Sequence, residues 1–290
     1  MLNKKDFIDR IKRNPEPKEV TEMREHILDS FKNLEFIEDG HKYYLHNEDG
    51  SIDEPISVST LVKEFEPYIN WELKAQQKAD KLGVDISIIK RQWEENQLLG
   101  TNPGTIHHAF GQQLMNLIID PNSEIMDCMK IQYEKGYLIP SAPKQEAIMK
   151  YWEDIIKIDE IYPLISEVKM YMPKNNKFGI NKLYCGTADI TFAIKHKGEW
   201  CILLHDYKNN KTLINDFARN AKQMMLPPFE ELVDEPMSHY TFQLSAYSLM
   251  LMNLGYKVID RKLIWIKNNG EYEKIQLEDI TQKIINFYQN

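Results

Sequence analysis

Three acidic residues and one lysine stand in, or at the ends of, segments whose composition predicts β-strands. Asp189 follows Gly-Thr-Ala, Asp206 and Lys208 are two residues apart, and Glu167 precedes both segments. Side chains two residues apart on a strand point to the same face, so Asp206 and Lys208 share one face. A carboxylate at the end of an apolar strand is tolerated where it binds a cation. The set therefore predicts a metal site suited to phosphodiester hydrolysis.

Two aspartates from neighbouring strands can share one hard divalent cation. We expect Asp189 and Asp206 to share Mg²⁺ or Mn²⁺, because Mg²⁺ prefers octahedral oxygen ligands. Lys208 would orient a metal-bound water or stabilise an oxyanion, a contribution of roughly 2.7–4 kcal/mol. Glu167 could ligate the ion, act through a water, hold a second ion or only shape the site. An isolated Asp-x-Lys pair is more often a solvated turn or an ion pair, so the ordered set carries the prediction.

Two further groups follow helical spacing. Gln243 and Tyr247 are four residues apart and therefore share one helix face, from which both could contact a phosphate or a metal-bound water. Thr105, His107 and His108 follow Gly104, where we expect a helix to begin. A helix N-terminus favours an anionic phosphate, and a histidine there could bind metal. Taken singly, these residues are more typical of ordinary packing positions.

Composition limits the class of protein. The chain has 290 residues, 42% of them hydrophobic, and a net charge of −8. An acidic balance argues against broad coating of duplex DNA, and less strongly against an enzyme with a local nucleic-acid channel. No apolar run of transmembrane length and no signal peptide is evident, so we expect no membrane association and a cytoplasmic protein of a bacterial or phage-infected cell. Three unpaired cysteines exclude a four-cysteine iron–sulfur cluster built from this chain alone.

The first hundred residues predict helices around a hairpin. Helical spacing covers residues 1–33, broken at 14–17, and a hairpin is expected over 36–45. A short helix should begin near Ser57, and two charged helices should occupy 70–99. Trp71 and Trp93 in these helices could stack on the bases of a single strand under a helical arch, or they could belong to the core.

The remainder predicts an α/β core. A loop is expected at 100–105, then helices at about 105–119, 143–157 and 238–254 and another from about 278. Strands are expected at 161–172, 182–194, 199–207 and 257–267. The strand at 199–207 is apolar on both faces, which indicates a central strand covered on both sides. We expect one domain over residues 1–290, with a helical extension (1–35), a hairpin and helical subregion (36–100) and a catalytic core (101–290).

The order of these motifs resembles the PD-(D/E)XK nuclease superfamily, and within it the RecB-like exonuclease branch. The motifs are Gly-Thr-Ile-His-His at 104–108, Glu167, Gly-Thr-Ala-Asp at 186–189, Asp-Tyr-Lys at 206–208 and Gln-Leu-Ser-Ala-Tyr at 243–247. The resemblance runs from about residue 36 to about residue 267. It implies a restriction-endonuclease-like core with a central mixed β-sheet flanked by helices, plus an N-terminal hairpin and a helical insertion.

The resemblance also implies roles for individual residues. Asp189, Asp206 and the backbone carbonyl of Tyr207 would bind the metal, and Lys208 would be the catalytic lysine. His108 would lie near the metal, with His107 as the alternative. The remaining members are Glu167 as the early acidic residue, and Gln243 and Tyr247 as a helix pair that lines the site. An alanine precedes Asp189 where the superfamily name has proline, and no iron–sulfur cofactor is implied.

The predicted activity is that of a Mg²⁺- or Mn²⁺-dependent exodeoxyribonuclease acting on DNA ends or single strands in replication, recombination or repair. No helicase motif is present, so unwinding would come from a helicase or another recombination or replication protein. Two alternatives stay open. One is an endonuclease of the same fold, and the other is a catalytically silent module that binds DNA or protein.

Overall fold

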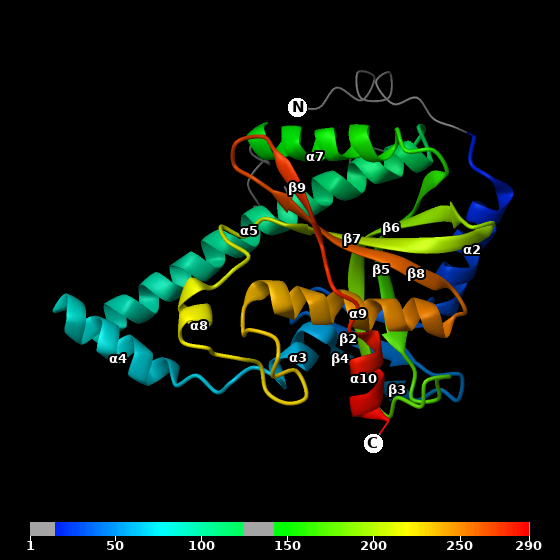
Figure 1. The fold of residues 1–290 in the computed structure, drawn as a ribbon. Helices are drawn as coiled ribbons and strands as arrows, with labels where there is room; N and C mark the ends of the chain where they lie inside the picture. Colours follow the sequence, from blue (N-terminus) through cyan, green and yellow to red (C-terminus); the bar gives the residue numbers. More distant parts are fainter. Residues whose placement is uncertain (1–14, 124–141, 290) are drawn as a thin grey trace.

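The computed structural model describes residues 15–123 and 142–289, and for residues 96–103 it describes the backbone alone. Within these ranges the chain forms a mixed sheet of six strands with helices on both faces (Figure 1). The predicted α/β class with a central mixed sheet flanked by helices is therefore confirmed. The part of the first predicted helix in residues 1–14, and Cys128, lie outside the described residues.

Three long antiparallel strands form one side of the sheet, followed by a parallel strand and then by an antiparallel strand at the opposite edge. The strands are β4 (Ile56–Ser57), β5 (Ile161–Met172), β6 (Tyr184–His196), β7 (Glu199–Lys208), β8 (Lys257–Ile266) and β9 (Tyr272–Gln276). Strand β6 pairs antiparallel with both β5 and β7, and β8 runs parallel to β7. The four predicted strands are confirmed to within two residues at each end.

The sheet forks beside β6. Strand β5 pairs with β6 from Tyr184 to Ile194, so β4 and β7 must share the other edge of β6. The pairing of β6 with β7 ends at Ile190 and His205, whereas β4 pairs only with the first two residues of β6. Strand β7 stays paired with β8 through Lys208. Backbone groups in the fork need partners other than a neighbouring strand, which admits polar side chains into the sheet.

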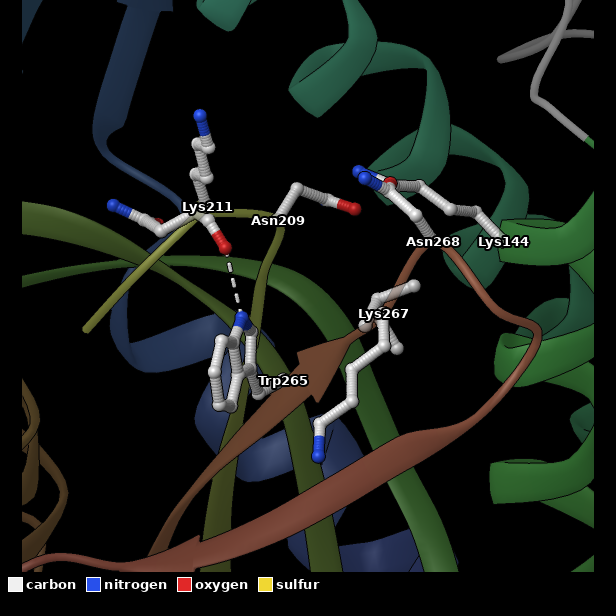
Figure 2. A pocket seen from close by; sticks show the side chains of 8 residues that line it. Lys144, Asn209, Lys211, Trp265, Lys267 and Asn268 are labelled. Carbon is white, nitrogen blue, oxygen red and sulfur yellow. Dashed lines mark hydrogen bonds between the residues drawn. The ribbon is translucent and has the colours of Figure 1, made fainter.

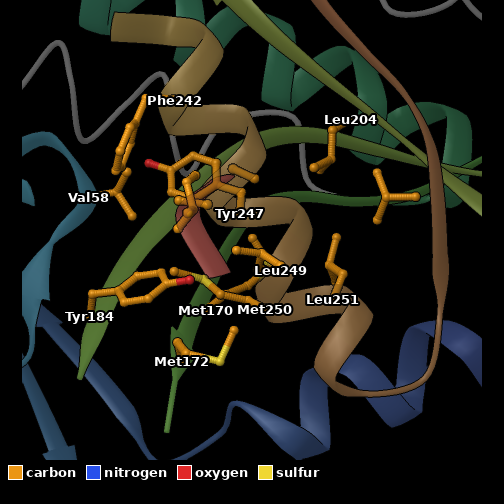
Figure 3. Close-up of a cluster of buried hydrophobic side chains, with 14 of the residues drawn as sticks. Val58, Met170, Met172, Tyr184, Leu204, Phe242, Tyr247, Leu249, Met250 and Leu251 are labelled. Carbon is orange, nitrogen blue, oxygen red and sulfur yellow. The ribbon is translucent and has the colours of Figure 1, made fainter. Parts of the chain in front are cut away.

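Two hydrophobic layers enclose the sheet. Helices α5 (Ile86–Ile119) and α7 (Ala142–Ile155) cover one face, where Leu114 and Trp152 pack with β-strand residues such as Phe192. The other face carries α2 (Lys18–Ser30), α3 (Val58–Lys63), α9 (Pro236–Asn253) and α10 (Thr281–Tyr288). Figure 3 shows the core beneath α9, in which Leu249, Met250 and Leu251 are fully buried. Burial on both faces explains why the central strands lack polar alternation.

The predicted hairpin is present and closes over one end of β6. Strand β1 (Leu34–Ile37) pairs with β2 (Lys42–His46), and a short β3 (Ile52–Asp53) extends it. Leu34, Tyr43 and Leu45 pack together on Cys185 of β6. This contact places the hairpin beside the forked part of the sheet.

A helical arm projects from the sheet on the α5 side (Figure 1). Helix α4 (Trp71–Leu82) ends at Gly83, whose φ of 65° is the left-handed conformation that glycine adopts readily. Helix α5 then begins with Asp85 as N-cap. The two helices predicted within 70–99 are therefore confirmed.

The predicted loop at 100–105 is wrong, because α5 runs through it without interruption. Proline inside a helix removes one hydrogen bond and its ring clashes with the carbonyl four residues earlier, a cost of about 3 kcal/mol that burial of the following turns can offset. The turns after Gly104 pack Phe110 and Leu114 into the core beneath the sheet. Thr105, His107 and His108 thus lie in a helix interior, and the expected phosphate site at a helix N-terminus does not exist.

The other predicted helices are confirmed as α3, α7, α9 and α10, and the Ser57 hydroxyl caps α3 by accepting from the Thr60 N–H. Short elements escaped prediction: β3, β4, β9 and α8 (Asp216–Asn220). Too few residues for a recognisable period explain these omissions. None of the described helices is both long and apolar enough to cross a bilayer.

Gly111 of α5 lies directly against the ring of Tyr207, and a methyl group there would come within 2.4 Å of it. We expect Gly111→Ala to lower the free energy of unfolding by about 1–3 kcal/mol, measured by urea denaturation, because the buried ring has little room to move. Gly104→Ala in the same helix is the matched control. No atom lies within 4 Å of its added methyl group, so it should be neutral or stabilising by about 0.5–1 kcal/mol. Equal stability of the two variants would contradict this packing.

Candidate metal centre

Asp189 and Asp206 occupy opposite sides of the fork, one residue beyond the last pair of β6 and β7. The Asp189 Oδ2 atom accepts a hydrogen bond from the Tyr207 N–H at 2.8 Å. The side chain of Asp189 thus replaces the strand partner that Tyr207 would otherwise have. The N–H and C=O of one residue leave a strand on the same edge, so the Tyr207 carbonyl also faces the fork.

Glu167 brings a third carboxylate to the same level of the sheet. Its neighbours Ser166 and Val168 pair with Ile190 and Ala188, which sets Glu167 opposite Asp189. Glu167 itself has φ 49° and interrupts the pairing at this point. A glutamate in this left-handed conformation carries backbone strain, and such strain is often found at functional sites. The three carboxylates therefore come from three adjacent strands.

Helix α5 adds a histidine from one face of the sheet. The His108 Nδ1 atom lies 3.2 Å from Asp189 Oδ2 and 4.0 Å from Glu167 Oε1. His108 also packs edge-on against the Tyr207 ring, with centroids 5.8 Å apart. His107 is 3% exposed, and it is His108 that contacts these carboxylates. Thr105 lies one turn before His108 and is half-buried.

Lys208 and Asp206 form an ion pair next to this group. The Lys208 Nζ atom lies over the ring of Tyr240 of α9, 4.3 Å from its centroid. Asp206 is 2% exposed. Lysine therefore enters the fork from the α9 face, while His108 enters from the α5 face.

Gln243 and Tyr247 line the site from α9, as their spacing predicts. The Gln243 amide donates to the Tyr247 hydroxyl at 2.9 Å. Tyr247 is 4% exposed, and a methyl group on Gly186 would meet its ring at 2.5 Å. Glycine at this position is thus required for the close approach of α9 to β6. Burial raises the pKa of Tyr247 well above its ordinary value, and the nearby Asp206 carboxylate acts in the same direction, so this hydroxyl stays protonated.

Some neighbours of the site did not emerge from the sequence. Tyr240 is one turn before Gln243 on the same face of α9, a spacing that could have marked it. Gly111 carried no signal, because its role depends on Tyr207 of a remote strand. Tyr43 of the hairpin bonds the Thr187 hydroxyl at 3.0 Å, a contact that no sequence period indicates.

Two alternatives were expected for the tryptophans of the arm, namely packing in the core and stacking on bases, and the two residues differ in burial. Trp93 packs on the small apolar cluster between α4 and α5, as a core residue would. Trp71 is 62% exposed and meets Trp93 edge-on at 5.9 Å. Lys78 Nζ lies 5.6 Å from the centroid of the Trp93 ring.

Burial and mutual repulsion control the charges of the carboxyl groups. Burial and the Asp189 charge raise the pKa of Glu167 to about 8, and the same two causes raise the pKa of Asp206 to about 6. Burial also opposes the charge of Asp189, but His108 and Lys208 hold its pKa below the ordinary value. The negative charge of the group in turn raises the pKa of His108 to about 9, against the effect of burial. The metal-free site therefore holds more protons than isolated groups would.

The residues present fit a divalent cation. Ligand atoms of His108, Glu167 and Asp189 all lie within 4.8 Å of one another. Ligands at the Mg²⁺–oxygen distance of 2.0–2.1 Å are separated by at most about 4.2 Å, so a shift of a few tenths of an ångström suffices. These three residues form the tightest group among the described histidines, cysteines and acidic residues. Asp206 lies outside this group and pairs with Lys208, and its expected sharing of an ion with Asp189 stays a prediction.

The partly buried Glu167 carboxylate, repelled by Asp189, should lower the free energy of unfolding of the metal-free protein at neutral pH. Its folded-state pKa of about 8 exceeds the ordinary 4.5, so its ionisation disfavours the folded state. Stability is then lost as the pH rises from about 4.5 through about 8. We expect Glu167→Gln to raise the free energy of unfolding at pH 8 by at least about 1 kcal/mol.

Urea denaturation of the metal-free protein at pH 5 and pH 8 measures this effect. The matched control is Glu230→Gln, which changes an exposed glutamate and should not alter the pH dependence. If Glu167→Gln follows the wild-type pH dependence, the assigned electrostatics are wrong.

The sequence matches no protein-family model and no curated protein. A function for the chain therefore has to follow from the chemistry of the residues at the fork.

Proposed function

We propose that the chain is a metal-dependent deoxyribonuclease of the PD-(D/E)XK type, in which Asp189, Glu167 and His108 hold the metal ion. One observation carries the proposal: these ligands converge at a fork of the sheet beside the Asp206–Lys208 pair. Three carboxylates held so closely repel one another, and a divalent cation removes that repulsion. The lysine beside these ligands is a positively charged donor that phosphodiester hydrolysis can use and that a purely structural metal site does not need.

The sheet supports the restriction-endonuclease-like core that this proposal entails. Three antiparallel strands, β5, β6 and β7, are followed by the parallel strand β8, with α5 and α9 on opposite faces. Glu167, Asp189 and the Asp206-x-Lys208 pair come from those three strands in order. Tyr207, with its carbonyl toward the fork, completes the proposed ligands.

A bound ion would neutralise charge on the phosphate and lower the pKa of a coordinated water. Lys208 stays protonated, because Asp206 and Asp189 raise its pKa although burial opposes this. Its ammonium group is a fixed positive charge and a donor for the attacking water or a phosphate oxygen. Tyr247 and Gln243 supply neutral donors from α9.

DNA ends or single strands are the proposed substrate, in replication, recombination or repair. Glu167 and His108 keep 30% and 28% of their side chains exposed, so the centre can be reached from solvent. The exposed ring of Trp71 on the arm offers a stacking surface for an unpaired base. A helicase or recombination protein remains the proposed source of unwinding.

Loss of Lys208 tests the mechanism. We expect Lys208→Ala to reduce cleavage of end-labelled DNA in Mg²⁺ by about 10²–10³-fold, because a preorganised donor to the developing charge is removed. Lys257→Ala changes a lysine at the opposite end of the neighbouring strand β8 and should leave cleavage unchanged. Equal activity of Lys208→Ala and the wild type would refute the assigned role.

Linear and covalently closed circular substrates separate the two kinds of nuclease. Degradation of linear DNA alone supports the proposed exonuclease, whereas cutting of circles shows an endonuclease. Failure to cleave either, with metal binding intact, would favour the silent binding module.

Metal binding should be coupled to proton release. Mn²⁺ should raise the Tm of the wild type and have little effect on Asp189→Asn, which loses a charged ligand. Glu167 and His108 hold protons at neutral pH, and a cation must displace those protons from its ligands. We therefore expect the affinity for Mn²⁺, measured by isothermal titration calorimetry, to fall as the pH is lowered from 8 to 6. An affinity that does not change over this range would contradict the ligand assignment.

A further inference from the structure

A polar pocket opens just beyond Lys208, where β7 and β8 end (Figure 2). Its volume is about 290 Å³. Three segments form it: the residues after β7, the turn between β8 and β9, and the first turn of α7. The lining residues are Lys144, Asn209, Asn210, Lys211, Trp265, Ile266, Lys267 and Asn268.

The lining is strongly cationic in a protein of net charge −8. Among the described residues that line it are three lysines and no aspartate or glutamate. Lys267 is paired with Glu273 at 2.7 Å. For Lys144 and Lys211, no ion pair exists within the part of the chain that the structure describes. Two positive charges in the pocket are thus left uncompensated.

Lys144 is the strongest sign of a ligand. The residue as a whole is 9% exposed, and the partial withdrawal of its ammonium group from water lowers its pKa. A buried charge without a partner is costly, so such a residue is retained where a ligand supplies the opposite charge. Lys144 also lies in the first turn of α7, where the helix dipole adds positive potential. Figure 2 shows its side chain pointing toward that of Asn209.

Asn209 offers a second unsatisfied group. Both polar atoms of its side chain are buried, and neither has a hydrogen-bond partner among the described residues. The loop around it is nevertheless well anchored. Trp265 donates from its ring nitrogen to the Asn210 carbonyl at 2.8 Å, and the Tyr240 hydroxyl donates to the Asn210 side chain at 3.0 Å. The Asn209 amide is therefore held in place by an anchored loop.

We propose that this pocket binds a phosphate group of the nucleic-acid strand that is cleaved at the neighbouring centre. The assignment rests on the proposed nuclease function for the identity of the strand. Lysine ammonium groups and an asparagine amide are donors that match phosphate oxygens. A neutral sugar or base would leave the buried Lys144 charge unpaired.

The position of the pocket suits a strand that passes the metal centre. Asn209 directly follows Lys208, and three residues of strand separate its Cα from that of Asp206 by about 10 Å. A phosphate held by Lys144 and Asn209 thus lies within a few nucleotides of the bond to be cut. Binding there would set the register of the strand at Lys208 and fix which phosphodiester bond reaches the metal.

Direct binding to the metal-free protein tests the pocket without cleavage. The probes are inorganic phosphate, followed by isothermal titration calorimetry, and fluorescent oligothymidylates with a 5′-phosphate, a 3′-phosphate or only hydroxyl ends, followed by anisotropy. Lys144→Gln and Lys211→Gln should each weaken binding of the preferred probe by at least about tenfold, the loss expected for one charge-assisted hydrogen bond. Lys144→Gln should also raise Tm, because it removes a buried unpaired charge.

Lys157→Gln is the matched control, since it removes the same charge from an exposed position just after α7 and should bind like the wild type. Preference for one phosphorylated end identifies a terminal phosphate as the ligand, and equal binding of all three oligonucleotides identifies an internal one. Wild-type affinity in both pocket variants, or an equal loss in Lys157→Gln, would overturn the proposal.

Failure of the nuclease proposal is distinguishable from failure of the pocket. Phosphate binding that depends on Lys144, in a protein that cleaves no DNA, would leave the anion site standing and refute the nuclease function. Cleavage that depends on Lys208, with phosphate and oligonucleotide binding unaffected by both pocket substitutions, would refute the phosphate site and leave the nuclease function standing.

Discussion

The repulsion among the carboxylates of Glu167, Asp189 and Asp206 is the interaction around which the rest of the site is arranged. Asp189 and Asp206 are withdrawn from water and Glu167 is only partly exposed, so the charges are poorly screened. His108 and the Tyr207 N–H stabilise the charge of Asp189, and Lys208 pairs with Asp206. Even so, the pKa values of Glu167 and Asp206 stay raised. A site with this residual repulsion is prepared for a cation.

The fork makes such a site compatible with a stable sheet. Where β7 leaves β6, the backbone needs partners that a strand no longer provides, and Asp189 supplies one to Tyr207. The large apolar layers under α5 and α9 can offset the local cost, because most of the sheet is covered on both faces. Unfavourable charge is also concentrated nearby, at Lys144, where an anion would offset it. The proposed metal and phosphate sites, which carry opposite charge, thus lie close to the same end of β7.

Long, continuous apolar segments were predictable, and short or edge elements were not. β5 to β8 contain long runs of β-branched, aromatic and other apolar residues, which mark them as strands even without polar alternation. β9 is a five-residue edge strand, and its alternation is too brief to separate from a turn. The error at residues 100–105 has another cause: glycine and proline weigh heavily in local propensity, whereas burial of the turns around Phe110 kept α5 continuous.

The sequence by itself determined the order of the chemical groups and the shared face of Asp206 and Lys208, because both follow from neighbouring residues and strand period. The same holds for Gln243 and Tyr247 on one helix face. Only the tertiary structure decided that His108 rather than His107 meets the carboxylates, and that Glu167 lies opposite Asp189. It also decided that Lys144 is buried beside Asn209. These relations depend on pairing and packing between segments far apart in the chain, which no local pattern encodes.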